Sequence, residues 1–453
     1  MASVFLVFTA APAGAALTEA ARLAAIYDTI LRARFDRVDA QIADACPPAP
    51  VEACNALAAV SVWWQILLDP GSRRLDQRFG ELTATATAAS EAWTKREPEK
   101  AEAWFYLAGS YAPLVQWRVL RGERVAAARG GNRIREALER ALRLDPSLQD
   151  AYFGIGLYHY YADVVPGTVK FVRWLMFLPG GDRVKGLREM LQARDRGELL
   201  TGEADYQLHL LYLWYEHRTE DALALVEGLD ERYSSNPLFL IRIAEIQDVY
   251  MHDHPASAAA WEELLARTRR GHVNAARLAE ARARLGLARE LDAMFETDRA
   301  VDELTAVVKL APASPAGARA QAELQLGAAY DRLGQRDLAV RAYSAAVTLG
   351  SGDEGSSIRE KARAELERVM AAPAAPAIVR ASAYVDYAAA LERAGDRDRA
   401  LALYRDAAQM IGGDPRARDR ARRAIARLNP RVRAETFSDF CGTSCLTSPF
   451  SHP

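Results

Sequence analysis

A repeated pair of helices constrains this chain more than any other feature of its sequence. The clearest unit, at residues 322–347, reads AELQLGAAYDRLGQRDLAVRAYSAAV. Small and large residues recur in both halves, at Leu326, Gly327 and Tyr330 and then at Ala339, Tyr343 and Ala346. Gly334 lies between the halves and predicts a turn. The small residues let two helix axes approach and the tyrosines fill the space between turns, so the unit predicts a helical hairpin.

The same pattern returns along most of the chain, and it resembles the tetratricopeptide repeat. That family combines W-x2-L-G-x2-Y, then A-x3-F, then P in about 34 residues. The match is clearest over 279–312, 320–350 and 381–412, and it is looser over 101–193. Residues 17–98 and 200–275 still alternate helix-like runs with turn signals. The stretch around 153–187 also resembles exported bacterial repeat proteins of unassigned activity.

The resemblance implies an all-α fold, a tetratricopeptide-like α-solenoid of roughly 8–10 stacked antiparallel helix hairpins. The length of 453 residues also favours an array, because a single core stops growing near about 250–300 residues. We expect a signal peptide at 1–16, a divergent N-terminal solenoid at 17–278 with inserts at 112–133 and 163–182, a regular array with a polar capping helix at 279–428, and an irregular tail at 429–453.

The N-terminus and the cysteines bear on where the protein is found. Residues 4–11 form a short apolar run, and Ala13-Gly14-Ala15 offers a small-residue cleavage site. No basic residue precedes Arg22, so a frayed apolar helix is the alternative to a signal peptide. After export, Cys46 and Cys54 would close a short loop as a disulfide; idle or buried thiols are the alternative. Export would place the protein in the periplasm, and without it the protein would be cytoplasmic.

Composition and motifs favour binding over catalysis. The chain has 58 basic and 60 acidic residues, a formal net charge of −2, so the charge pattern typical of nucleic-acid binding is missing. The sequence holds no nucleophile elbow, phosphate-binding loop, zinc-protease motif or EF-hand loop. His209 and His217 are eight residues apart, but the interleaved Leu, Tyr and Trp favour packing. We therefore predict no catalytic residues, no cofactor and no metal.

The resemblance places a protein-binding groove on the first helix of each pair. Aligned to the repeat, the groove-facing positions are Gln321, Leu324, Ala328, Asp331 and Arg332 in one unit, and Ser382, Val385, Ala389, Glu392 and Arg393 in the last. The family's Lys/Asn/Arg clamp for a terminal carboxylate is replaced here by Ala, aliphatic residues and one Arg per unit. This lining fits a peptide or a helix with an apolar face.

An oily segment interrupts the repeat that begins at Ala151. Thr168–Leu178 is too short to span a bilayer and carries Phe171, Trp174 and Phe177. It could pack across repeats, anchor at a membrane surface as a peripheral contact, or dock another protein. The aromatic residues from Tyr152 to Tyr161 are either core or ligand surface.

The sequence therefore predicts a non-enzymatic helical-repeat scaffold for protein–protein interaction, in the bacterial envelope. Two alternatives remain. One is a small-ligand-binding or enzymatic protein with a pocket near Tyr152–Arg183, and the other is a peripheral membrane scaffold held by Thr168–Leu178.

Overall fold

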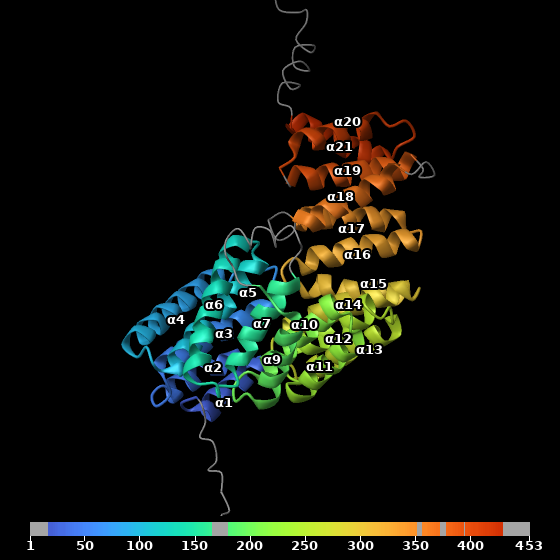
Figure 1. Ribbon diagram of the computed structural model, residues 1–453. Helices are drawn as coiled ribbons and strands as arrows, with labels where there is room; N and C mark the ends of the chain where they lie inside the picture. Colours follow the sequence, from blue (N-terminus) through green and yellow to red (C-terminus); the bar gives the residue numbers. More distant parts are fainter. Residues whose placement is uncertain (1–16, 165–179, 351–355, 372–376, 394, 429–453) are drawn as a thin grey trace, which may run out of the picture. The chain divides into compact units, whose positions relative to one another are not determined.

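The computed structural model describes residues 17–164, 180–350, 356–371, 377–393 and 395–428, and these form 20 α-helices and one π-helical turn (Figure 1). The all-α solenoid prediction is confirmed, because consecutive helices pack on one another in a tetratricopeptide-like series. The chain divides into two compact units, residues 1–283 and 284–453. The predicted signal peptide and tail lie outside the described residues.

The first unit holds α1 to α13 and the start of α14. Its helices are α1 (Ala20–Leu31), α2 (Phe35–Ala45), α3 (Val51–Leu68), α4 (Asp76–Arg96), α5 (Ala101–Leu120), α6 (Arg124–Leu144), α7 (Ala151–Val164), α9 (Arg183–Arg196), α10 (Thr201–Leu211), the π-turn η1 (Tyr212–Glu216), α11 (Thr219–Arg232), α12 (Pro237–Val249) and α13 (His254–Arg269). The unit boundary falls within α14 (Ala276–Ala293), the helix that also contains our expected boundary at 278–279.

Residues 112–133 do not form the insert that we expected. They complete α5 and begin α6, which are 20 and 21 residues long and joined by a tight turn at Gly122 with a φ of 81°. A β-carbon at Gly130 would lie 2.5 Å from Val115, so the two long helices pack closely up to this turn. The prediction of an insert was wrong because the repeat pattern assumes helices shorter than α5 and α6.

Helices α7 and α9 form the hairpin that we expected around the oily segment. A β-carbon on Gly186 would lie 2.5 Å from the carbonyl oxygen of Gly156. Glycine at both positions therefore allows backbone contact, while Met190 is fully buried beside them. Part of the predicted insert, residues 165–179, lies outside the described residues, and Phe171, Trp174 and Phe177 lie there.

Helix α3 is the core helix of the first unit. Among the described residues it alone is long and apolar enough to cross a membrane, and 67% of it is buried in the protein. A disulfide joins Cys54 on this helix to Cys46, with the two Cα atoms 6.6 Å apart. The bond closes the loop between α2 and α3.

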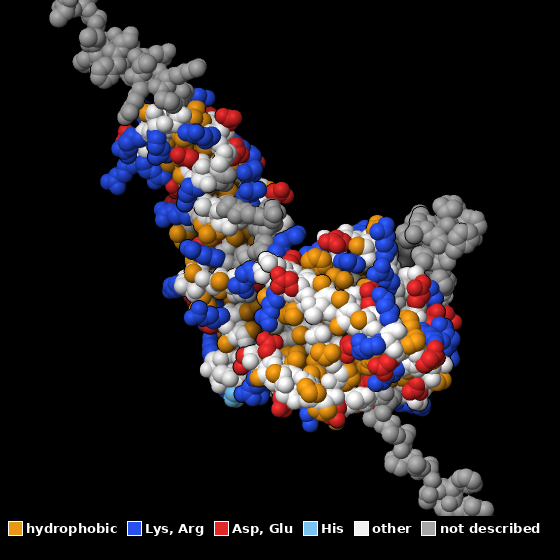
Figure 2. All heavy atoms as spheres, turned by 90° about the vertical axis from the view of Figure 1, so that its left-hand side faces the viewer, with side chains coloured by type: hydrophobic (Ala, Val, Ile, Leu, Met, Phe, Trp, Pro, Cys, Tyr) orange, Lys and Arg blue, Asp and Glu red, His pale blue; other side chains and the backbone are white. Residues whose placement is uncertain are grey.

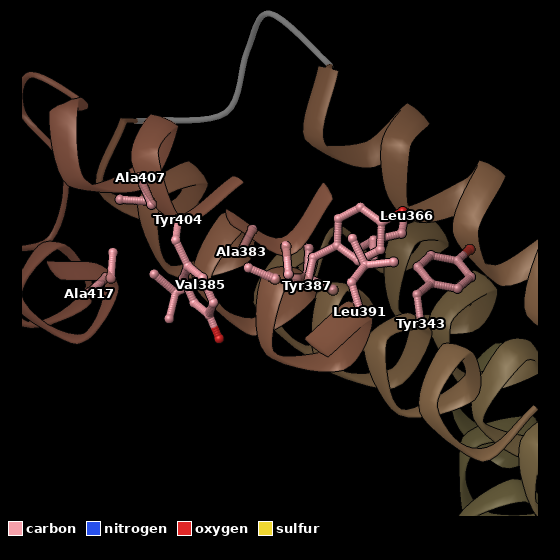
Figure 3. Close-up of a cluster of buried hydrophobic side chains, with 14 of the residues drawn as sticks. Tyr343, Leu366, Ala383, Val385, Tyr387, Leu391, Tyr404, Ala407 and Ala417 are labelled. Atoms are coloured by element: carbon pink, nitrogen blue, oxygen red, sulfur yellow. The ribbon is translucent and has the colours of Figure 1, made fainter. Parts of the chain in front are cut away.

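The second unit holds the rest of α14 and the helices α15 (Thr297–Leu310), α16 (Ala318–Arg332), α17 (Arg336–Leu349), α18 (Ser356–Ala371), α19 (Ala377–Arg393), α20 (Arg397–Gln409) and α21 (Pro415–Leu428). Figure 3 shows its core as a row of side chains from successive helices, including Tyr343, Leu366, Tyr387 and Tyr404. The ring of Tyr343 packs directly against Gly327. A β-carbon at that position would lie only 2.5 Å from the ring carbons. Small and large residues thus interlock as the repeat pattern predicts.

The last described helix, α21, buries only alanines. Ala417, Ala421 and Ala424 face the core, and the arginines of its other face are mostly exposed. A polar outer face of this kind is typical of a capping helix in a solenoid.

Candidate functional site

A buried carboxyl group organises the interior of the first unit. Glu203 on α10 accepts hydrogen bonds from the Tyr27 hydroxyl at 2.9 Å and from Gln207 Nε2 at 3.0 Å. Gln207 Nε2 also donates to Gln116 Oε1 on α5, at 3.2 Å. Burial raises the pKa of Glu203, and the hydrogen bonds offset part of that rise. Three helices that are distant in sequence therefore meet at one polar group.

Aromatic rings and a histidine continue this interior. The Trp64 ring lies 5.0 Å from the Tyr206 ring, which lies 4.8 Å from the ring of His209. His209 is fully buried, and neither ring nitrogen has a well-formed hydrogen bond within the described chain. Burial and, to a smaller extent, the charge on Arg242 lower the pKa of His209 to about 3, although a hydrogen bond with the Tyr206 backbone raises it in part. His209 is therefore neutral at physiological pH.

Arg242 on α12 lies next to Tyr206 of this ring cluster. Arg242 Nη1 on α12 donates to Glu245 Oε2 at 2.5 Å, and the Nε atoms of Arg242 and Arg282 are both buried without a partner in the described chain. Together these groups form what we call the interior polar cluster: Tyr27, Gln116, Glu203, Tyr206, Gln207, His209, Arg242 and Glu245. Buried polar groups are rarely left unsatisfied, so the cluster is a candidate site.

Our sequence interpretation missed the interior polar cluster. Its signal is present in EADYQLHLLYLW, where Glu203 and Gln207 lie four residues apart within an oily helix, a spacing that places both on one face. The buried position of His209 confirms that it packs in the core, whereas His217 is exposed. The two histidines therefore do not form one site.

An exposed apolar surface lies at the end of α10 and α12. We call it the aromatic surface; it consists of Trp214, Tyr215, Val249, Tyr250 and Met251, each between 37% and 56% exposed. The π-turn η1 carries Trp214 outward, and Trp214 Nε1 donates to the Tyr250 hydroxyl at 3.0 Å. The polar tips of these two side chains are bonded to each other, so their ring faces dominate what the surface offers.

In the stretch Tyr152–Arg183, where we considered a pocket, several of the described side chains form ion pairs and hydrogen bonds. Arg183 binds Glu216 through two nitrogens, at 2.5 and 2.7 Å, and the Tyr160 hydroxyl donates to the same carboxylate at 2.5 Å. His159 lies 2.7 Å from Glu189. The hydrogen bond from Arg183 lowers the pKa of Glu216. These contacts hold α7, α9 and η1 together and leave no unpaired acid or base among these five side chains.

Hydrophobic members of the predicted groove are part of the core of the second unit. Val385 is 3% exposed, and Leu324 and Ala389 pack against the same cluster. The assignment of Val385 to a groove is wrong, because α19 is packed against helices on both sides, α17 and α21 among them. Alignment to the repeat identified the positions of α19 but did not specify how the helix is rotated about its own axis, and that rotation decides which side chains are buried.

Several charged groove positions bridge neighbouring helices. Arg332 donates to Asp292 at 2.7 Å, Asp331 accepts from Arg368 at 2.8 Å, and Glu392 accepts from Arg427 at 2.7 Å. Arg393 is exposed and bonds its own helix at the Ala389 carbonyl. Gln321 and Ser382 are half-buried, and Ala328 is exposed. Exposed pairs of this kind contribute about 0–1 kcal/mol each.

One further surface is uncharged. The outward face of α4 carries Ala84, Ala88 and Ala92. Figure 2 looks onto the α4 side of the first unit, where hydrophobic and uncharged side chains cover the middle and charged ones the margins. Small residues alone carry no recognition chemistry, so we assign no site here.

Three similar solved structures share 13–14% sequence identity with the chain. No family model matches the chain, and no curated protein matches its sequence. Among solved structures, a human IFIT1 dimer with PPP-AAAA is 13% identical, covers 79% of this chain and 72% of its own, and has a TM-score of 0.42. A chain of the APC/C hetero-tetramer Cut9-Hcn1 is 14% identical, with a TM-score of 0.42. The match covers 75% of this chain and 55% of the Cut9-Hcn1 chain. A Rap protein complexed with Competence and Sporulation Factor is 13% identical, over 90% of this chain and 99% of its own, with a TM-score of 0.38.

Proposed function

We propose that the chain is a non-enzymatic helical-repeat scaffold that binds another protein. The aromatic surface carries this proposal. Tryptophan, tyrosine and methionine are enriched in protein interfaces, and contiguous exposed apolar side chains are uncommon on monomeric proteins. The residues of this surface follow the ends of α10 and α12, two helices whose side chains are largely buried.

The chemistry of the surface selects an apolar polypeptide segment as its partner. Trp214 and Tyr250 bond each other through their polar atoms, at 3.0 Å, so a partner meets ring faces. His217 and Arg218, which follow η1 in the chain, are both exposed. The groove positions of the second unit that remain accessible, Ala328, Arg332 and Arg393, form a second proposed contact.

Crosslinking in an envelope extract, followed by mass spectrometry, tests the proposal. We expect one protein to crosslink to the wild-type chain through an apolar segment, and a synthetic peptide of that segment to compete. The Trp214→Ala, Tyr250→Ala double variant should lose capture at least about tenfold, because central aromatic residues carry most binding energy. Phe295→Ala, which removes an aromatic side chain that is 84% exposed elsewhere, should capture normally.

A second pair of substitutions tests the groove. Arg332→Ala with Arg393→Ala removes one ion pair and one exposed charge, and the fold should tolerate both. Full capture by this pair and by the Trp214, Tyr250 double variant would contradict the proposal.

We also propose that the protein acts in the bacterial envelope after export. The apolar run at residues 4–11 and the disulfide between Cys46 and Cys54 support this, since disulfides persist in oxidising compartments. Fractionation of cells expressing the full chain should place it in the periplasm. A cytoplasmic location with free thiols at both positions would contradict export.

A further inference from the structure

Exposed apolar side chains of the first unit gather at the turns of its hairpins. Among its described residues, every exposed large apolar side chain except Val51 lies at such a turn. Val119, Leu120 and Val125 flank the turn between α5 and α6, and Val184 lies in the first turn of α9. Val125 and Val184 are both 68% exposed. Two successive hairpins therefore each carry an apolar tip, in addition to the aromatic surface.

These two tips lie on the same edge of the unit. Helix α6 packs against α7 (Figure 1), with Leu138 2.6 Å from where a β-carbon on Gly154 would lie. One turn nearer the start of α6, the Arg135 guanidinium lies 5.6 Å from the ring of Tyr158. The two helices are therefore antiparallel, and the first two turns of α6 reach the end of α7 and pass it. The first residue of α9 donates its backbone N–H to Asp163 in the last turn of α7, so both hairpins end on this edge.

Each apolar tip has an arginine one helical turn behind it. Arg129 follows Val125 by four residues on α6, and Arg188 follows Val184 by four residues on α9, a spacing that places each pair on one face of its helix. Both arginines are exposed, and neither forms an ion pair within the part of the chain that the structure describes. Long side chains on a helix lean toward its N-terminus, which in α6 and α9 is the tip. The two guanidinium groups therefore extend along the valines and carry positive charge that the protein does not neutralise.

We propose that the two tips bind the surface of an anionic lipid bilayer, with the apolar side chains at the hydrocarbon boundary and the arginines at the headgroups. Interfacial binding combines apolar side chains with basic ones that reach lipid phosphates. Four residues of helix separate the two kinds of side chain by about 6 Å, which matches the depth of roughly 5–10 Å to which such apolar faces are buried.

The arrangement of the tips favours a bilayer over a protein partner. The core of a protein interface is a contiguous patch packed as closely as a protein interior, whereas these apolar side chains stand on two separate hairpins. A bilayer surface accepts such side chains one by one, and its anionic headgroups complement Arg129 and Arg188. We call these residues the tip surface: Val119, Leu120, Val125, Arg129, Val184 and Arg188.

Vesicle flotation of the full chain tests the tip surface. The probes are vesicles of phosphatidylglycerol and phosphatidylethanolamine in equal parts, compared with vesicles of phosphatidylcholine alone. The wild-type chain should float with the anionic vesicles and less with the neutral ones. Val125→Glu with Val184→Glu should lower the anionic partition coefficient at least about tenfold, because apolar burial is lost and the new charges are repelled. Arg129→Gln with Arg188→Gln should lower it by about tenfold while leaving the neutral value unchanged. All four side chains are exposed, so circular dichroism should show the wild-type helix content in both variants.

Val51→Glu is the matched control, because Val51 is also an exposed valine at the start of a helix. It lies at the other end of its hairpin, where Glu52 of α3 pairs with Arg96 of α4 at 3.1 Å, and this variant should float like wild type. The Trp214→Ala, Tyr250→Ala double variant should also float normally, which separates lipid binding from capture of a protein at the aromatic surface.

Four outcomes would overturn the proposal. The first is equal flotation with both kinds of vesicle, and the second is full flotation of the Val125→Glu, Val184→Glu variant. The third is flotation lost only in Trp174→Glu with Phe177→Glu, which would assign the contact to residues 168–178. The fourth is a dimer in vesicle-free solution that the two valine substitutions abolish, because the tips would then bind a second copy of the chain.

Discussion

At the scale of single residues, the polar side chains of the first unit depart most from a plain repeat core. Glu203 and His209 lie on one oily helix, α10, and both are buried. Each group keeps its neutral form more readily than in water, since burial raises the pKa of Glu203 and lowers that of His209 to about 3.

His209 makes the stability of the first unit depend on pH. Between its ordinary pKa of about 6.5 and about 3, the unfolded chain binds a proton at His209 and the folded chain does not. Stability is therefore lost as pH falls through this window. Comparing pH 7 with pH 5, His209→Leu should remove about 2 kcal/mol of the acid-induced loss, measured by urea unfolding with tryptophan fluorescence.

The exposed His217 provides the control for this pH effect. His217→Leu should leave the difference between the two pH values as in wild type. If His209→Leu loses as much stability on acidification as wild type does, His209 is already protonated in the folded chain.

At the scale of elements, glycine decides how closely paired helices approach. Gly156 and Gly186 let α7 and α9 touch through their backbones, and Gly327 makes room for the ring of Tyr343. Backbone atoms cannot move aside as a flexible side chain can. The α7–α9 contact should therefore be the less tolerant of the two to an added methyl group.

Gly186→Ala should lower the free energy of unfolding of the first unit by roughly 1–3 kcal/mol, the usual cost of overpacking. Its control is Gly131→Ala on α6, where nothing lies within 4 Å of the added carbon. That change should be neutral or stabilising by up to about 1 kcal/mol, because alanine favours helix more than glycine does. Urea unfolding followed by tryptophan fluorescence measures both, and a neutral Gly186→Ala would show that the hairpin can open.

At the scale of the whole molecule, the contacts of a solenoid run between successive repeats. Leu366 is fully buried in the core that joins α17 to α21. Because each repeat contacts mainly its neighbours, a cavity made there should destabilise the second unit locally. The second unit contains no tryptophan, so tryptophan fluorescence reports the unfolding of the first unit alone.

Leu366→Ala should cost the second unit about 2–5 kcal/mol. Circular dichroism should then show an earlier loss of helix, while the tryptophan transition of residues 1–283 keeps its midpoint. A parallel shift of both signals would instead show that the chain unfolds as one cooperative body.

The hairpins could be predicted from sequence because their code is local. Gly327 and Ala339, the small residues of one hairpin, lie close together in the sequence, and their spacing indicates where the two helices pack. The period failed where helices are longer, at residues 112–133, and where a helix is packed on two sides, at Val385. Both errors concern rotation and length, which depend on neighbouring repeats.

The sequence by itself determined that this chain folds as paired helices stacked in series, since hydrophobic period and residue size act within a few turns of helix. Only the tertiary structure decided which polar residues meet. Tyr27 and Glu203 are 176 positions apart and share a hydrogen bond, and no local pattern records that distance. The packing of α1 beside α10 brings these two residues together, so the candidate sites follow from packing rather than from motif.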